Sequence, residues 1–458
     1  MTKVQKNTLI VSVTTAFITS FTASALNLSI PSIGAEFNVS ASLLGWVVTV
    51  YAMAACVLTV PFGRLADITG RKRILVTGIS TFAASSLIAA LSVNFLMVMV
   101  ARVFQGLSAS MIFATNQAII VSTFPGGERG RALGISISST YTGIALGPVL
   151  GGIINNYLGW RFIFWFMVIF ASYAATVAVR WLPSEQMNKD AYSKFDLKGN
   201  ILFISMMFSL MFGLCNMSYG WYSYILIAIG LILGVVFVRV ESKEETPVIK
   251  VSMFKNKPYA YSNIATFLNY TSTFVISYLL SIYLQVIQGF SSQTAGLIMI
   301  SQPVVMALLS PQMGKLSDKI SPFKLATAGM GFCACGLFML TFLNLDTGVW
   351  YIVVLLVLSG IGFAVFSSPN TNAVMSLVRR EDFGVATSIL NTMRNMGQNV
   401  CMAIITVVVS LRLGTKALAE ATPVELISTM RILFIIFTCT SILGIFFSMG
   451  RSIGKHQE

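Results

Sequence analysis

Two arginines lie inside long apolar segments of this chain, where a charged side chain needs partners. Arg102 lies in the apolar run that starts near residue 95, and Arg394 lies in the run that starts near residue 384. An arginine near the centre of a membrane-spanning segment costs roughly 2.5 to 3.5 kcal/mol on insertion scales. Its guanidinium can bind an anionic or zwitterionic group, or carbonyl and amide groups of the protein can satisfy it.

Arg394 has the more polar surroundings of the two. Asn391, Asn395 and Gln398 are close to it in the sequence, and helical spacing places part of this set on one face. One interpretation is that Arg394 faces a central cavity and attracts an anionic or zwitterionic part of a solute. The alternative is that it bonds to backbone carbonyls or Asn side chains and only fixes helix packing.

A charged segment that separates two apolar runs occurs twice. Residues 63–72 read GRLADITGRK, and residues 314–324 read GKLSDKISPFK. Asp67 can pair with Arg71 and accept hydrogen bonds from the first amides of a neighbouring helix, but only while two parts of the protein are closed together. We therefore predict a conformational latch formed by Gly63, Asp67, Gly70, Arg71 and Asp318. The alternative is that these charges only keep a short loop at the interface.

Acidic residues are missing from the middle of every apolar run. Asp67 and Asp318 fall in loops, and Glu36 follows just beyond Pro31. A proton carrier inside a membrane needs a titratable group, and arginine stays charged at physiological pH. The sequence therefore predicts no membrane carboxylate for proton coupling.

Composition and patterning predict an all-α polytopic membrane protein. Hydrophobic residues make up 56% of the 458 residues, charged residues only 10%, and the mean hydropathy is +0.81. The chain contains about 14 apolar runs, each long enough to cross the hydrocarbon core of a bilayer as a helix. We expect them to start near residues 8, 43, 74, 95, 132, 161, 200, 221, 259, 295, 324, 350, 384 and 428.

The charge distribution predicts the orientation. Most of the 30 Lys and Arg residues fall on the side of the N-terminus, and positive charge marks the cytoplasmic side of a membrane protein. We expect a cell-membrane protein with both termini in the cytoplasm. The same bias explains the net charge of +14, so no nucleic-acid partner is needed.

Metal, disulfide and enzyme sites are not predicted. All six cysteines, and none of them in a CxxC pair, fall inside predicted spans, and the only histidine, His456, lies in the C-terminal tail. No GxSxG segment, ligand cluster or pair of acids occurs in the spans. We expect no cofactor and no catalytic residue.

Matching glycines divide the chain into two similar halves. Four glycines of the first half each match a glycine roughly 250 positions later in the second half. The pairs are Gly63 with Gly314, Gly106 with Gly360, Gly130 with Gly384, and Gly143 with Gly397. We expect six-helix bundles at 1–183 and 255–458. Residues 184–254 hold linkers and two inserted helices, and we expect the linkers to be hinges.

Four segments resemble motifs of the major facilitator superfamily, in its fourteen-span drug/proton antiporter branch, which includes tetracycline and multidrug exporters. They are GRLADITGRK, ARVFQG at 101–106, GIALGPVLGG at 143–152 and FDLKG at 195–199. The resemblance implies the major facilitator fold, two six-helix bundles plus two inserted helices, and export by antiport. It also implies a role for Arg102 in proton or substrate coupling. The alternative for Arg102 is hydrogen bonding to carbonyls or Gln105.

The antiporter motif comprises Gly143, Gly147, Pro148, Gly151 and Gly152. Its glycines allow close contact with another helix, and its proline removes one backbone donor. The alternative is a packing motif without directional meaning. The second half has Cys401 where Gly147 would align, and Thr22 stands where many relatives are expected to carry an acid.

Polar and aromatic residues of the spans give candidates for a substrate cavity. They are Asn27, Trp46, Tyr51, Asn116, Gln117, Tyr141, Tyr270, Gln302, Asn370, Asn372, Asn391, Arg394 and Gln398. The expected function is export of small amphipathic compounds by alternating access with proton antiport, the partners being a solute, protons and the bilayer. The alternatives are a transporter of organic anions or lipid-like molecules, and a membrane receptor or scaffold without transport.

Overall fold

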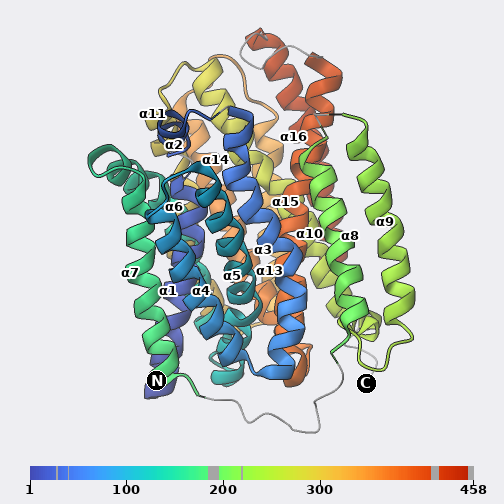
Figure 1. Cartoon of the computed structure of the whole chain (residues 1–458). Coiled ribbons are helices and arrows are strands. Elements are labelled where there is room, and N and C mark those ends of the chain that lie inside the picture. Colours follow the sequence, from blue (N-terminus) through green and yellow to red (C-terminus); the bar gives the residue numbers. More distant parts are fainter. Residues whose placement is uncertain (27–28, 40, 184–194, 218–219, 414–421, 452–458) are drawn as a thin grey trace.

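The computed structural model describes residues 1–26, 29–39, 41–183, 195–217, 220–413 and 422–451. Within these ranges the chain forms helices and no strands (Figure 1). Thirteen helices of the described residues are long and apolar enough to cross a membrane. This agrees with the expected all-α polytopic membrane protein.

One further helix completes the predicted set of spans. α15 (Phe383–Leu413) has 31 residues and stands among the other long helices (Figure 1). Asn391, Arg394, Asn395 and Gln398 all lie in its middle, so the polar cluster that the sequence singles out belongs to this one helix.

The long helices fall into two sets of six and an inserted pair. The first set comprises α1 (Lys3–Ala25), α3 (Ala41–Thr69), α4 (Arg71–Ala90), α5 (Phe95–Thr123), α6 (Arg129–Tyr157) and α7 (Arg161–Trp181). The inserted pair is α8 (Leu197–Cys215) and α9 (Tyr222–Glu241). The second set comprises α10 (Lys257–Ile282), α12 (Ser301–Ser317), α13 (Pro322–Leu340), α14 (Val349–Ser376), α15 and α16 (Pro423–Met449).

Short helices continue or connect these elements. They are α2 (Ile30–Phe37), η3 (Val251–Lys255), η4 (Tyr283–Ile287), α11 (Ser292–Met299) and η5 (Arg380–Asp382). α11 and α12 together form the tenth predicted span, Gln293–Ser317, which is divided at Ile300. Neither this division nor α2 is visible in the hydropathy.

The halves contact each other through two equivalent helix pairs. α6 of the first half packs on α12 of the second, and α3 of the first half packs on α15 of the second. Within the halves, α1 packs on α6 as α10 packs on α15. The duplication that the glycines indicate is therefore also a duplication of helix contacts. The exact boundaries predicted at 183 and 255 remain predictions.

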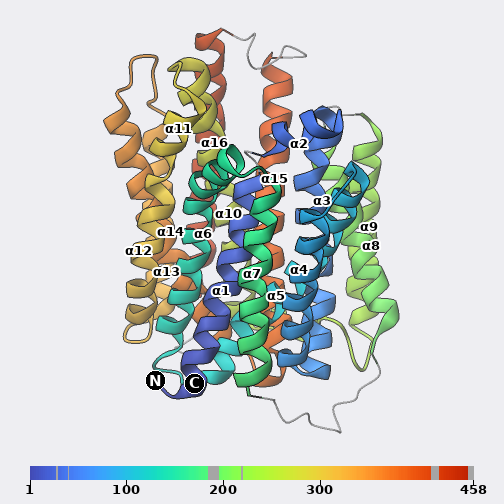
Figure 2. The ribbon, with the colours of Figure 1, turned by 60° about the vertical axis from the view of Figure 1, so that its left-hand side comes forward.

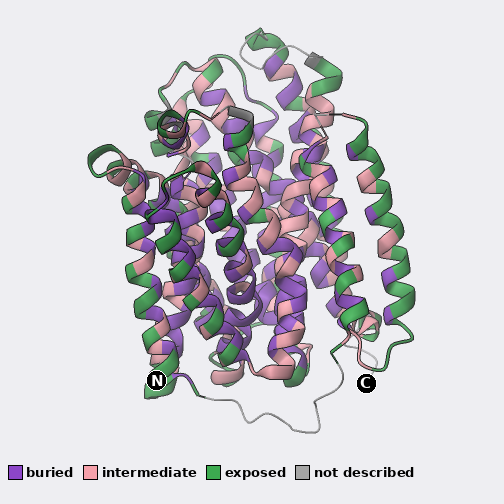
Figure 3. Ribbon diagram, viewed as in Figure 1, coloured by how far each residue is buried: buried purple, intermediate pink, exposed green. Residues whose placement is uncertain are grey.

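The inserted helices lie at one side of the bundle (Figures 1 and 2). α8 and α9 pack on each other, and α8 also packs on α3 and α15. α9 shows mostly exposed residues (Figure 3), and these include Leu231, Ile232 and Val235. An exposed apolar helix of this kind suits contact with lipid.

α1 begins and α16 ends at the same end of the bundle (Figures 1 and 2). We call this end the terminal end and the opposite end the far end. The acidic residues of the two charged segments and the residues that bond to them lie at the terminal end. An even number of crossings places both termini there.

Candidate functional site

Asp67 connects the two halves at the terminal end. Its Oδ1 accepts from the backbone N–H of Gly384 at 2.9 Å, and its Oδ2 accepts from the N–H of Val385 at 2.9 Å. These amides belong to the first turn of α15, whose free N–H groups and dipole favour a carboxylate. The site thus joins the end of α3 to the beginning of α15.

Arg71 strengthens this contact from the same half. Its Nη2 lies 2.8 Å from Asp67 Oδ1, and its guanidinium also donates to the backbone carbonyl of Arg380 in the other half. Gly70 has φ of 102°, a value that favours glycine, and there α3 ends and α4 begins. This turn brings Arg71 back onto Asp67, so the spacing in GRLADITGRK has a geometric reason.

Asp318 makes the equivalent contact with the halves exchanged. Its Oδ1 accepts from Gly130 N at 2.7 Å, and its Oδ2 accepts from Arg131 N at 2.9 Å. These amides begin α6. Asn372, a cavity candidate, donates from Nδ2 to Asp318 Oδ1 at 3.3 Å and therefore belongs to this contact. No arginine of the described residues pairs with Asp318 as Arg71 pairs with Asp67.

Glycines permit the close approach at both contacts. A Cβ added at Gly63 would meet the carbonyl oxygen of Gly384, and one added at Gly130 would meet that of Gly314. Both crossings pair a glycine of one half with a glycine of the other. The matching glycines of the sequence therefore mark the same crossing, formed twice.

Arg394 lies between helices of the second half and faces an aromatic ring. Its Nη2 donates to Thr371 Oγ1 at 2.8 Å, its Nη1 lies 3.3 Å from Asn391 Oδ1, and its guanidinium is 5.7 Å from the centre of the Tyr270 ring. Its buried Nε has no hydrogen-bond partner among the described residues. The side chain is half-buried, so it combines partial satisfaction with one unused donor.

Residues around Arg394 reach the first half. Asn391 Nδ2 donates to the backbone carbonyl of Phe113 in α5 at 2.9 Å. Tyr270 packs against the apolar cluster that holds Tyr141 of α6 and Phe363 of α14. We call Tyr141, Tyr270, Thr371, Asn391 and Arg394 the central cluster. It brings together four of the predicted cavity residues and adds Thr371, which the sequence analysis missed because a buried Thr gives no distinguishing signal.

Arg102 is fully buried inside the first half. Its Nε donates to Val47 O at 2.8 Å, its Nη1 donates to Gln105 Oε1 at 2.8 Å, and its guanidinium lies 4.3 Å from the centre of the Tyr51 ring. Gln105 in turn donates to Ser86 Oγ at 2.8 Å. These hydrogen bonds are the ones expected if Arg102 only stabilises helix packing. Its role in proton or substrate coupling remains a prediction.

Several cavity candidates lie outside the central cluster. Tyr51 donates to Thr19 O at 3.2 Å, and Trp46 packs in a tilted arrangement against Phe212 of the inserted helix α8, with ring centres 5.6 Å apart. Asn370 donates to Thr266 and accepts from Arg451 at 2.5 Å. Each of these side chains therefore contacts neighbouring residues away from the central cluster.

The remaining cavity candidates that the structure describes also lie outside the central cluster. Asn116 donates to Ser12 O at 3.3 Å, and its Oδ1, like Gln117 Oε1, is buried without a partner among the described residues. Gln302 is buried and Gln398 half-buried. Asn27 lies outside the described residues.

Arg451 is a buried charge that the sequence analysis missed. Its guanidinium donates to Ser448, to Ser262 Oγ at 3.2 Å and to Asn370, just beyond the end of α16. Burial lowers the pKa of Arg451 to about 9. Its only signal in the sequence is a position directly after an apolar run, which is where exposed arginines also occur.

The antiporter motif forms the contact between α6 and α1. Gly143 lies against Phe17 and Phe21, Gly147 against Ser24, and Gly151 against Ala25, each so closely that a Cβ would not fit without movement. Pro148 lies inside α6, and Gly152 beside it is half-buried. In the second half Gly397 approaches Phe267 and Thr271 of α10 in the same way. Cys401 is buried and packs in the apolar cluster that contains Val275.

Two six-helix halves, an inserted helix pair and polar groups between the halves define a multi-pass membrane protein of the transporter class. The sequence model of the Major Facilitator Superfamily matches residues 13–238 and 263–454, so the chain belongs to this family. The similarities place it in the family's drug-exporter branch. The family resemblance and the fold prediction are thereby confirmed.

Two relatives illustrate the range of similarity. The chain is 31% identical over 380 residues to the riboflavin transporter RibZ of Clostridioides difficile (strain 630), covering 83% of each protein. It is 28% identical over 413 residues to the multidrug resistance protein Stp of Mycobacterium tuberculosis (strain ATCC 25618 / H37Rv), covering 88% of this chain and 76% of the relative.

A solved structure has the same fold. The human organic anion transporter MFSD10 (TETRAN) superposes with a TM-score of 0.69, covering 97% of this chain and 99% of the other. The identity is 13%, so this similarity concerns the fold alone.

Proposed function

We propose that the protein exports small amphipathic compounds across the cytoplasmic membrane by alternating access of its two halves. The observation that carries the proposal is the pair of equivalent contacts at Asp67 and Asp318. Each can form only when the halves meet at the terminal end, so each acts as a latch for one conformation. The multidrug relatives support the class of solute.

The terminal end is the cytoplasmic end in this proposal. Most of the 30 Lys and Arg residues belong to the loops and helix ends on that side, as the positive-inside rule requires. The described conformation is then closed toward the cytoplasm. Opening inward requires both carboxylates to leave the helix N-termini that they bind. No catalytic residue or cofactor takes part in this cycle.

The central cluster is the proposed solute site. Arg394 offers an unused Nε donor and Tyr270 an aromatic face, and Asn391 links the cluster to the first half through Phe113. A solute that binds there contacts elements of both halves. This is the condition for coupling its binding to their relative movement.

Proton antiport is the proposed driving reaction, by analogy with the branch. The described spans hold acids only near their ends, as at Asp67 and Glu241, so a central carboxylate does not carry the proton. Arg394 favours a second candidate function, the transport of organic anions, because its charge has no carboxylate partner among the described residues. The two candidates differ in the sign of the solute charge that the site accepts.

Reconstitution in liposomes with a trapped pH dye tests the proposal. Cationic dyes and antibiotics are compared with organic anions for solute-dependent proton movement. The proposal expects cationic amphipathic solutes to evoke proton release. Movement of anions alone, or of cations without protons, contradicts proton-coupled drug export, and an absence of flux for the whole panel favours a receptor or scaffold.

A further inference from the structure

The base of the inserted helices contains two carboxyl groups that face each other. Asp196 caps the N-terminus of α8, where its Oδ1 accepts from Gly199 N at 2.8 Å. Glu241 is the last residue of α9 and is only 2% exposed. A Cβ added at Gly199 would overlap both Asp196 Oδ2 and Glu241 Oε1, so these two oxygens are direct neighbours. The two side chains are within hydrogen-bonding reach.

Both facing oxygens lack a donor. Asp196 Oδ2 and Glu241 Oε1 are buried, and neither accepts a hydrogen bond from a described protein atom. Neither carboxyl group forms a salt bridge with a Lys or Arg of the described residues. Two ionised carboxylates in this position would repel each other and leave both oxygens unsatisfied.

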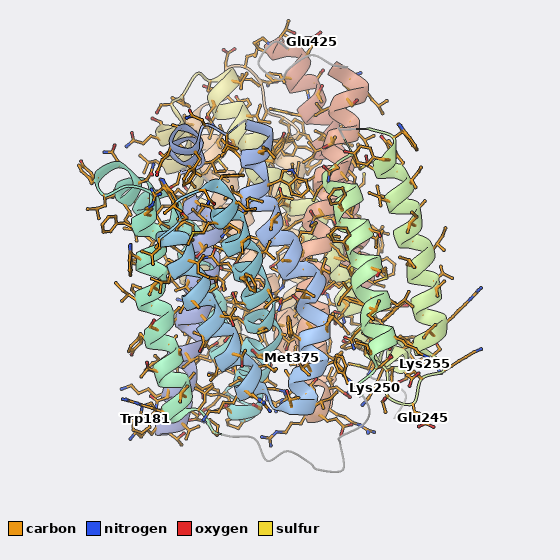
Figure 4. All side chains as sticks on the ribbon, viewed as in Figure 1. Trp181, Glu245, Lys250, Lys255, Met375 and Glu425 are labelled. Atoms are coloured by element: carbon orange, nitrogen blue, oxygen red, sulfur yellow. The ribbon has the colours of Figure 1, made fainter. Side chains whose placement is uncertain are left out.

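The charged groups nearby are directed elsewhere. Lys198 on α8 and Arg239 on α9 are exposed, as are the side chains that follow α9, Lys243, Glu244 and Glu245. Lys250, in the linker that follows α9, pairs with Asp382 at 2.8 Å. Figure 4 labels Glu245 and Lys250 at the terminal end, beside the bases of α8 and α9. No cation of the described residues replaces a proton between the two carboxyl groups.

We propose that Asp196 and Glu241 share one proton and form a proton-binding site at the base of the inserted helices. The proton lies between Asp196 Oδ2 and Glu241 Oε1, so one group donates and the other accepts. A single proton satisfies both oxygens and removes one of two negative charges. The site does not depend on which solute the protein moves.

A few residues connect the site of the shared proton to the start of α15, which Asp67 binds. Glu241 Oε2 accepts from Ile249 N at 3.1 Å and so holds the linker that follows α9 against the end of this helix. The next residue, Lys250, pairs with Asp382, which ends η5 directly before α15. Loss of the proton leaves two negative charges that repel each other, and this repulsion weakens the hydrogen bond from Glu241 that holds the linker. The linker, expected from the sequence to be a plain hinge, therefore carries a titratable attachment.

Infrared spectroscopy of the full-length protein in lipid at neutral pH tests the site. A protonated carboxyl group has a C=O stretching band that shifts in D₂O and is absent from a carboxylate. The wild type is expected to show such a band, and Glu241→Gln and Asp196→Asn are each expected to lose it. The matched control, Glu245→Gln on the exposed turn, is expected to keep it. A wild type without the band, or a band that survives both substitutions, overturns the proposal.

Thermal unfolding followed by tryptophan fluorescence gives an independent readout. The native state keeps the shared proton to higher pH than the unfolded chain does. The stability that this site contributes is therefore present in acid and is lost as the pH rises from the unfolded pKa of a carboxyl group, about 4, through the higher native pKa of the pair. Glu241→Gln removes the charge and retains an acceptor for Ile249, so it is expected to abolish that part of the pH-dependent loss. An identical pH dependence in the wild type and Glu241→Gln overturns the proposal, even if the variant is less stable at every pH.

Discussion

Asp67 and Asp318 hold equivalent positions in the two halves, and each binds two backbone amides of the opposite half. The amides belong to Gly384 and Val385 for Asp67, and to Gly130 and Arg131 for Asp318. Both pairs begin a helix, so each carboxylate is held by a helix N-terminus. The proposed latch is therefore double, although only the first copy includes an arginine partner.

Removing either carboxylate charge is expected to open the terminal end. In Asp67→Asn or Asp318→Asn, an amide replaces a carboxylate that accepts two backbone hydrogen bonds, and a charge-assisted hydrogen bond contributes about 1.5 to 3 kcal/mol. Spin labels at Glu128 and Lys319 should show a longer and broader distance distribution in both variants.

The control for this measurement is Asp346→Asn, in an exposed loop at the far end. It is expected to leave the label distances unchanged. Unchanged distances in both latch variants would mean that the charges only hold their loops at the interface.

Enlarging a glycine of the α1–α6 contact is expected to destabilise the first half. In Gly147→Ala the new methyl group would strike Ser24, and overpacking of this kind costs about 1 to 3 kcal/mol. The comparison is with Gly296→Ala, where a Cβ meets nothing within 4 Å. Thermal unfolding in detergent should show a lower midpoint for the first variant only. Equal midpoints would show that α6 adjusts at no cost.

Substitutions of Arg394 are expected to separate recognition from packing. If the guanidinium binds an anionic or zwitterionic group, Arg394→Lys keeps part of the affinity, while Arg394→Gln loses about 10- to 100-fold, the equivalent of one charged hydrogen bond. Equilibrium binding of a transported solute measures this. Arg412→Gln, at the exposed end of α15, is the control. Equal affinities for all three variants would assign Arg394 to packing.

The far end should respond to acid through Glu36. Hydrogen bonding to Arg161 lowers the pKa of Glu36, and the two side chains form a salt bridge of 2.7 Å. Because the native-state pKa is lowered, the pair stabilises the fold above the ordinary value of 4.5 and loses this contribution as the pH falls through the native value.

The side chains of Arg161 and Glu36 are 32% and 42% exposed, so the contribution is at most about 1 kcal/mol. Thermal unfolding of wild type and Glu36→Gln at neutral and acidic pH measures it. The wild type should be slightly more stable at neutral pH, and the difference should vanish in acid. A difference that persists in acid would contradict an ionic origin.

The sequence predicts the fold well because bilayer-spanning helices follow directly from apolar length. The contacts of the charged segments and the glycine crossings can also be predicted from the sequence, because a carboxylate at a helix N-terminus and a close helix crossing each need particular residue types. The rotation of each helix is harder to predict. Trp46 therefore packs on Phe212 of an inserted helix, and Asn370 binds Arg451, although both have polar or aromatic character that suits a cavity.

Pairings between distant loops are the other unpredicted part. FDLKG and the end of α9 are separated by the whole inserted pair, so the contact of Asp196 with Glu241 depends on how α8 and α9 pack. The contact of Arg71 with the carbonyl of Arg380 depends in the same way on the docking of the two halves. Neither spacing nor composition contains this information.

Reversible cross-linking across the α12–α6 contact tests the central claim, that solute moves only when the halves separate at the terminal end. In a background with the six cysteines replaced, Arg131→Cys and Lys319→Cys are joined by a cleavable bifunctional maleimide and solute flux is measured in liposomes. The control cross-link joins Lys3→Cys to Trp181→Cys within the first half, where Lys3 Nζ lies 3.8 Å from the Trp181 ring centre. We predict that the cross-link between the halves abolishes flux, that cleavage restores it, and that the control cross-link has no effect. Flux that continues while the halves are joined would contradict alternating access.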